Sequence, residues 1–223
     1  MSKYDEIISL GSNCDPGLSM RILKIKSETY PFDWVRSNTK IIFDLLQNGK
    51  NRYLSFGKKI SGDFYLKNLH YYTNKNFKKS HVNYYGQHFT HYKNISTNEL
   101  KNKFNRYIER FFSLLKSNKK ILFIHTNEEY IYHGQTRRHR NILYNYLCKI
   151  NDILEEKYPN LDFEIINIDI NNRFSNYKKI INLNIVNKFP FSNNCEFHIA
   201  KIWNVYRNNV TKIIKNYLEK NKL

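Results

Sequence analysis

Cys14 is the residue of this sequence best placed to do chemistry. The apolar, β-branched run 6–10 predicts a buried strand, and Gly11 ends it. Asp15 is a good helix N-cap and Pro16 suits the first helical position, so we expect a helix directly after Cys14. Unpaired N–H groups at a helix N-terminus stabilise a thiolate. This pattern predicts nucleophilic attack by a cysteine, although such a turn could instead bind a phosphate or simply connect two elements.

Three histidines could supply the base that a cysteine nucleophile needs. His198 stands at the start of the last predicted helix, behind an irregular loop. Its late position matches enzymes that carry the nucleophile first and the histidine last. His91 and His125 are the alternatives. A lone histidine among aromatic residues is more often structural, and spacing does not decide which one faces Cys14, so His198 is only the first choice.

A carboxylate would orient that histidine, and the candidates are Glu196 and Asp33. Asp33 lies between Phe32 and Trp34, so we expect it to be partly buried and to need a partner. It could orient the histidine or line a substrate cleft. As a structural residue it could instead cap the next helix or pair with Arg36.

Polar residues around the same turn are candidates for oxyanion and substrate binding. Backbone N–H groups after Cys14 could hold an oxyanion together with an asparagine, and arginines that open a predicted helix could hold a phosphate or carboxylate. Each of these side chains could equally be solvated surface. The candidates are Asn13, Asp15, Asn127, His91 and Arg137.

Strands and helices alternate along the chain and must position these residues. Apolar segments predict strands at 6–10, 120–126, 162–168 and 179–186, and periodic segments predict helices at about 15–25, 38–48, 97–115, 134–157 and 199–218. This order predicts an α/β three-layer sandwich, with a mostly parallel central sheet flanked by helices. The layout is similar to SGNH-type hydrolases with cysteine in place of serine. A papain-like α+β fold, with the cysteine on a long helix, is the alternative.

We expect a single α/β domain over residues 1–223, because no linker-like segment divides the chain. Residues from about 50 to 97 predict an irregular insertion rich in aromatic residues and histidine. His88 and His91 have a spacing that could join two metal ligands on a helix, but no carboxylate lies nearby. We therefore predict no metal site, and no motif predicts a cofactor.

The composition is strongly basic, with 37 Lys and Arg residues against 19 Asp and Glu residues and a net charge of +18. Such a surface could attract nucleic acid or another anionic partner. Codon bias explains the basic composition better. Lys, Asn, Ile and Tyr are all abundant, as expected of an A+T-rich bacterium or large DNA virus.

Several features predict a cytoplasmic protein, in a bacterial cell or in the host cell of a virus. No apolar run is long enough to span a membrane, and the N-terminus lacks a signal-peptide pattern. The three cysteines, Cys14, Cys148 and Cys195, are widely spaced and odd in number, which fits reduced thiols. Cys148 and Cys195 lack the strand-to-helix setting of Cys14.

Two motifs resemble a known family. SLGSNC at 9–14 and PFDW at 31–34 resemble a family of unknown function named "putative papain-like cysteine peptidase". FTH at 89–91 extends the resemblance, although Tyr92 stands where the family tends to have aspartate. Arg106 and Arg110 resemble the family's arginine-bearing helix. The resemblance implies a cysteine peptidase-like activity.

These observations together predict a thiol-dependent hydrolase or acyltransferase acting on an acyl or peptide substrate. Cys14 would attack the acyl carbon, His198 would act as the base, and water or a second acceptor would resolve the thioester. The alternatives are a non-catalytic module that binds a polyanion such as nucleic acid, and a degenerate enzyme that keeps the fold without activity.

Overall fold

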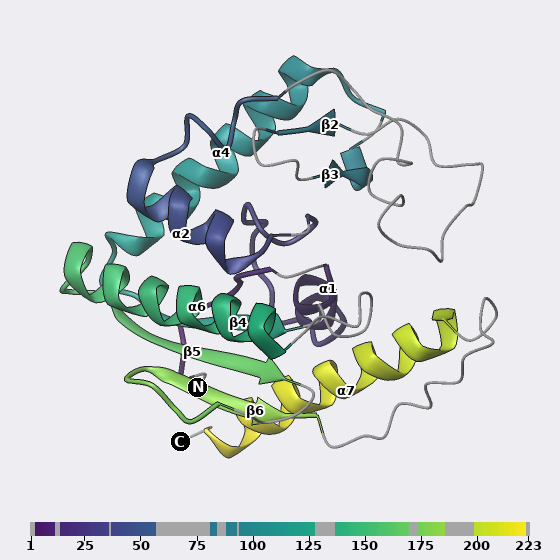
Figure 1. The fold of residues 1–223 in the computed structure, drawn as a ribbon, viewed down its shortest axis with the longest axis vertical. Helices are drawn as coiled ribbons and strands as arrows, with labels where there is room; N and C mark the ends of the chain where they lie inside the picture. Colours follow the sequence, from purple (N-terminus) through teal and green to yellow (C-terminus); the bar gives the residue numbers. More distant parts are fainter. Residues whose placement is uncertain are drawn as a thin grey trace.

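The computed structural model of the chain describes residues 3–11, 14–35, 37–56, 81–83, 88–92, 94–127, 137–169, 174–185 and 199–221. Its main sheet has four parallel strands, which lie side by side in the order in which they occur along the chain (Figure 1). They are β1 (Glu6–Ser9), β4 (Lys120–Asn127), β5 (Asp162–Asp169) and β6 (Ile180–Asn184). The α/β fold and the parallel sheet are thus confirmed, with strand ends that differ from the predicted ones by one or two residues.

The strand register brings the carboxyl ends of all four strands to one edge of the sheet. Ser9 of β1 lies opposite Ile124 of β4, and Asn127 at the end of β4 lies opposite Asp169 at the end of β5. Asp169 in turn lies opposite Asn184 of β6. Ligands of parallel α/β sheets bind outside this edge, which is also where the chain continues from β1 to Cys14.

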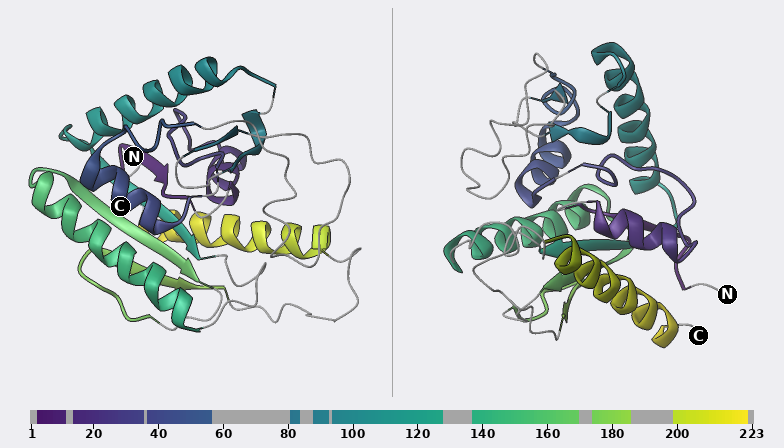
Figure 2. Two further views of the ribbon diagram at one scale, coloured as in Figure 1. Left: turned by 45° about the horizontal axis from the view of Figure 1, so that its top comes forward. Right: turned by 90° about the vertical axis from the view of Figure 1, so that its right-hand side faces the viewer.

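Helices cover both faces of the sheet (Figure 2). One core cluster joins Ile8, Phe123 and Ile165 to α2 (Thr39–Asn48), α4 (Thr97–Leu115) and α6 (Arg137–Lys157). The other joins Ile7, Leu122 and Ile124 to α1 (Asp15–Ile22) and α7 (Ile199–Lys220). Successive strand residues point to opposite faces, so a parallel strand buried on both faces reads as one apolar run.

Helix α1 differs from its prediction at both ends. Cys14, and not Asp15, is the N-cap residue, so Asp15 is already helical. The helix ends at Ile22 and does not continue through Ile25, because Lys24 adopts a left-handed backbone with φ of 55°. The N–H of Ile25 then donates to the carbonyl of Met20 at 3.1 Å. This reversal closes the helix in the manner of a Schellman motif.

Part of the predicted insertion is described. It contains β2 (His81–Val82), which pairs antiparallel with β3 (His88–Phe89), followed by the 3₁₀ turn η1 (Thr90–Tyr92). Phe89 is fully buried, and its ring lies 4.9 Å from that of Phe104 in α4. The small sheet is therefore anchored on α4 through aromatic packing. Residues 57–80 and 84–87 lie outside the described residues.

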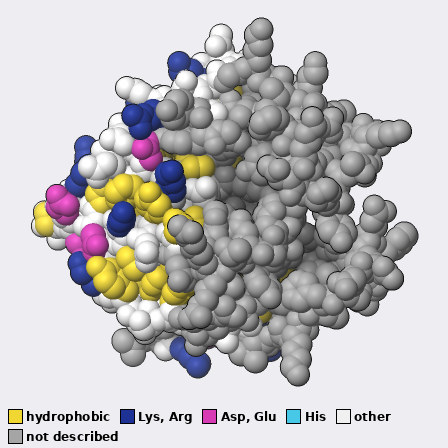
Figure 3. All heavy atoms as spheres, in the orientation of Figure 1, with side chains coloured by type: hydrophobic (Ala, Val, Ile, Leu, Met, Phe, Trp, Pro, Cys, Tyr) yellow, Lys and Arg dark blue, Asp and Glu magenta, His cyan; other side chains and the backbone are white. Residues whose placement is uncertain are grey.

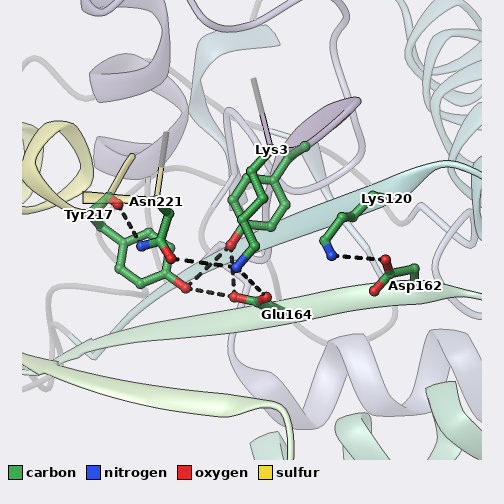
Figure 4. Close-up of polar contacts among 7 residues, drawn as sticks. Lys3, Lys120, Asp162, Glu164, Tyr217 and Asn221 are labelled. Carbon is green, nitrogen blue, oxygen red and sulfur yellow. Dashed lines mark hydrogen bonds and ion pairs between the residues drawn. The ribbon is translucent and has the colours of Figure 1, made fainter. Parts of the chain in front are cut away.

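A polar cluster ties the first and last described segments to the sheet at the opposite edge from Cys14 (Figure 4). Glu164 of β5 accepts hydrogen bonds from the hydroxyls of Tyr4 and Tyr217, each at 2.7 Å, and Lys3 Nζ lies 2.8 Å from its other oxygen. These donors lower the pKa of Glu164 to about 2, against the opposing effect of burial. The C-terminal end of α7 is thereby fixed beside β5 and the start of β1.

The described surface mixes charges of both signs. On the face in Figure 3, Lys and Arg side chains lie among acidic and hydrophobic ones. Lys178, for example, lies 2.8 Å from Asp152 and 3.1 Å from Glu155. Among the helices of the described residues, none is both long and apolar enough to cross a membrane.

Candidate active site

The turn between β1 and α1 is shaped by Gly11. Its φ of 79° is left-handed, and a Cβ there would lie 3.0 Å from the Cβ of Ser37. The N–H of Gly11 donates to Ser9 Oγ at 3.0 Å, and the N–H of Leu10 donates to the carbonyl of Ile124 at 2.8 Å. Only glycine combines this conformation with such a close approach. Gly11 therefore sets the direction in which the chain leaves β1.

Cys14 itself is half-buried and stands at the N-terminus of the eight-residue helix α1. Its carbonyl accepts the N–H of Leu18 at 2.9 Å, as expected of an N-cap residue. Its side chain makes no capping hydrogen bond. The sulfur is thus not used to cap the helix, and the dipole of α1 favours a thiolate at this position.

The PFDW loop packs directly against the first turn of α1. A Cβ on Gly17 would lie 2.8 Å from the carbonyl oxygen of Asp33 and 3.3 Å from its Cα. Gly17 follows Cys14 by three residues, so both lie on the same side of α1. On the other side of Cys14 in the sequence, a Cβ on Gly11 would lie 3.5 Å from the Cβ of Phe32. The loop therefore contacts the chain both before and after Cys14.

Asp33 is fully buried and holds its own loop together. Its Oδ2 accepts the N–H of Tyr30 at 2.6 Å and forms an ion pair with Lys26, whose side chain is also buried. Burial raises the pKa of Asp33, while the charge of Lys26 opposes that rise. Burial likewise lowers the pKa of Lys26 against the opposing charge of Asp33. Arg36, the predicted partner, lies outside the described residues.

Trp34 connects this loop to His91. The rings of Trp34 and His91 meet edge to face with centroids 6.1 Å apart, and Lys26 Nζ lies 5.5 Å from the centroid of the Trp34 ring. His91 is exposed. The structure thus brings the loop that carries Asp33 against both the helix of Cys14 and His91, a candidate base and substrate-binding residue. No contact of His91 with Cys14 is observed among the described residues.

Asp15 is buried, with 1% of its surface exposed. Its Oδ1 accepts a hydrogen bond from Arg207 Nε of α7 at 2.7 Å. One turn further along, Thr211 Oγ1 donates to Ser19 Oγ at 2.9 Å. The carboxylate beside Cys14 therefore faces α7 and is engaged by a cation.

His125 lies on the α6 side of the sheet and forms a polar row with two asparagines. The register places His125 opposite Asn167, and Asn167 opposite Asn182. Asn167 Oδ1 lies 2.8 Å from His125 Nδ1, and Asn167 Nδ2 donates to Asn182 Oδ1 at 2.8 Å. Because an amide oxygen only accepts, Nδ1 carries the proton. Burial lowers the pKa of His125 to about 4, which keeps the ring neutral near pH 7.

Other predicted site residues lie outside the described residues. These are Asn13, Glu196 and His198, together with the side chains of Asn127 and Arg137. The backbones of Asn127 and Arg137 are described: one ends β4 at the carboxyl edge of the sheet, and the other begins α6. Among the described residues, no group of three His, Cys, Asp or Glu side chains could hold a metal ion.

Three residues of this region gave no local signal in the sequence. Lys26, Asn167 and Arg207 each contact a partner that lies elsewhere in the chain or on another strand. The expected burial of Asp33 indicates that a partner is needed, but it does not single out Lys26. Arg110 is different, since it belongs to a recognised motif: it lies 2.7 Å from Glu28 and donates to the carbonyl of Thr29, which holds the segment leading to the PFDW loop.

We expect Gly17→Ala to lower the free energy of unfolding by about 1–3 kcal/mol, because the new methyl group would overlap the Asp33 carbonyl. Alanine would otherwise favour the helix by about 1 kcal/mol. The rate of Cys14 alkylation should change as well. Urea unfolding and mass spectrometry measure the two effects. Ser113→Ala, at an exposed position of α4, is the control. Unchanged stability in Gly17→Ala would contradict the packing.

Comparisons with known proteins match this part of the chain. The family model described as "Putative papain-like cysteine peptidase (DUF1796)" matches residues 5–172, a stretch that includes Cys14 and Asp33 but not His198. An uncharacterized protein of Acanthamoeba polyphaga mimivirus is 29% identical over 140 residues. The aligned part covers 56% of this chain and 62% of that relative, so this chain spans less than two thirds of the relative's length. No solved structure matches.

Proposed function

We propose that this chain is a thiol-dependent hydrolase or acyltransferase, because it belongs to the "putative papain-like cysteine peptidase" family. Cys14 is the proposed nucleophile. The observation that carries the proposal is its place at the start of α1, next to the carboxyl edge of a parallel sheet, with the PFDW loop packed on both sides of it. Nucleophile turns of α/β hydrolases share this position between a strand and a helix.

The proposed reaction begins when the Cys14 thiol gives its proton to a histidine base and attacks an acyl carbon. Backbone N–H groups at the start of α1, with Asn13 or Asn127, would stabilise the oxyanion. The leaving group departs with the proton from the histidine, and a thioester remains on Cys14. Water or a second acceptor then releases the acyl group. His198 remains the predicted base, oriented by Glu196, since Asp33 is engaged by Lys26 and Tyr30.

Two finer proposals follow. The cysteine turn directly after the first strand of a parallel sheet favours an SGNH-like arrangement over a papain-like one, in which the cysteine lies on a long helix. We also propose a cytoplasmic site of action, because three widely spaced cysteines fit reduced thiols better than a disulfide framework. The net charge of +18 supports an anionic partner less strongly, since described cations such as Lys178 are paired with acids.

The test is the pH dependence of alkylation at Cys14 by iodoacetamide. We expect a thiol pKa about one to two units below the ordinary value of about 8.5. His198→Ala should raise it, and Cys14→Ala should remove the adduct and any turnover of a fluorogenic thioester. Cys148 is an internal control, since burial raises the pKa of its thiol. An ordinary pKa at Cys14, with no acyl transfer, would overturn the proposal.

A further inference from the structure

The carboxylate next to Cys14 would by itself destabilise a thiolate nucleophile. Asp15 follows Cys14 directly, and it is buried with 1% of its surface exposed. Two negative charges at neighbouring positions repel each other strongly where water is excluded. An uncompensated Asp15 would therefore favour the protonated thiol and oppose the helix dipole of α1.

Arg207 supplies the compensating charge. Its Nε donates to Asp15 Oδ1 at 2.7 Å, and 28% of its side chain is exposed. It comes from α7, which is far from α1 in the sequence. Among the described residues, the other buried ion pair near this turn joins Asp33 to Lys26, so each carboxylate has its own cation.

The same pair sets the register of two helices. Arg207 of α7 contacts Asp15 of α1, and Thr211 contacts Ser19 one turn later. The two helices therefore run parallel to each other. Eight residues separate Ile199 from Arg207, and at 1.5 Å per residue α7 begins about 12 Å beyond this contact. Figure 1 shows its first turns extending past α1. The start of α7 directly follows the predicted base His198.

We propose that Arg207 is a positioning residue of the Cys14 site, which neutralises Asp15 and fixes the start of α7 relative to the nucleophile. The proposal rests on the proposed function of Cys14. Arg207 acts through Asp15 and is not itself placed at the reacting atoms. At the first turn of α1, Asp15 pairs with Arg207 of α7, and the Lys26–Asp33 pair belongs to the loop beside Gly17.

The test compares the pH profile of Cys14 alkylation in three variants. Arg207→Gln should raise the thiol pKa by about one unit and slow alkylation at pH 7 by about three- to eightfold. The double variant Asp15→Asn/Arg207→Gln removes both charges and should restore the wild-type rate or exceed it. Thr211→Val removes the second link between α1 and α7 without changing charge, and it should keep the wild-type profile.

The outcomes separate this inference from the function on which it rests. If the wild-type thiol titrates normally and transfers no acyl group, the proposed function fails before any variant is made. If the wild type is reactive and Arg207→Gln keeps its profile, the inference on Arg207 is wrong. Should Arg207→Gln not fold, the double variant decides: wild-type reactivity or more supports the proposal, and a slowed thiol overturns it.

Discussion

We expect Lys26→Met to lower the free energy of unfolding by about 3–5 kcal/mol, as the loss of one partner of a buried ion pair does. The methionine keeps an unbranched side chain that is one atom shorter, but it leaves Asp33 without this cation in a fully buried position. Protonation of the Asp33 carboxyl limits the loss of unfolding free energy, because a neutral carboxyl needs no cation. At pH 7, protonating a carboxyl of ordinary pKa costs about 4 kcal/mol. Urea unfolding at pH 7 and at pH 5 measures the effect, which should be smaller at the lower pH.

Two variants control this experiment. Lys119→Met breaks a 3.4 Å ion pair to Glu6 in which the lysine side chain is 51% exposed, so it should cost less than about 1 kcal/mol. Lys26→Met/Asp33→Asn removes both charges and leaves an amide oxygen that can still accept the N–H of Tyr30. It should regain most of the lost stability. Equal losses for Lys26→Met and Lys119→Met would refute the assigned role of the buried pair.

The secondary structure was largely predictable from the sequence. The strands and helices were predicted well, because their apolar residues repeat with a clear period and bury both faces of the sheet. The end of α1 was not, since nothing in a lysine at position 24 predicts a left-handed backbone. Glycine or asparagine would have given that signal.

The candidate site was predictable in part. Gly11, Cys14 and Pro16 mark a turn before a helix through local rules, and the described residues show β1 ending at Ser9 and α1 beginning at Asp15, with Cys14 and not Asp15 as the N-cap. Asp33 could be suspected of burial from its aromatic neighbours, but not of pairing with Lys26. The pair of Asp15 with Arg207 joins residues 192 positions apart. Such contacts depend on how helices dock, and a single sequence does not encode that docking in any local pattern.

These long-range pairs give the motifs a physical meaning. The glycines at 11 and 17 allow the PFDW loop to approach the chain on both sides of Cys14. Lys26 neutralises the carboxylate of that loop, and Arg207 neutralises the carboxylate of α1. Buried charge around the turn is therefore balanced in separate pairs. The dipole of α1 would then act on the negative charge of a Cys14 thiolate and stabilise it.

The neutral state of His125 has a consequence that pH can reveal. The folded pKa is about 4, below the value of about 6.5 expected of an unfolded histidine. Between these values the unfolded chain binds a proton that the folded chain does not. Stability from this residue is therefore fully present above about pH 6.5 and is lost as pH falls toward 4. The loss is about 1.4 kcal/mol per pH unit and about 3 kcal/mol in total.

His125→Gln tests this expectation, because a glutamine amide can still donate to Asn167 Oδ1 but does not titrate. Carboxylates also titrate between pH 4 and 6.5, so the measured quantity is the difference in unfolding free energy between variant and wild type. That difference should change by about 3 kcal/mol in favour of the variant as pH falls from 7 to 4. His91→Gln is the matched control, because it replaces an exposed histidine in place of a buried one. A constant difference for His125→Gln would mean that the ring is not held neutral by burial beside Asn167.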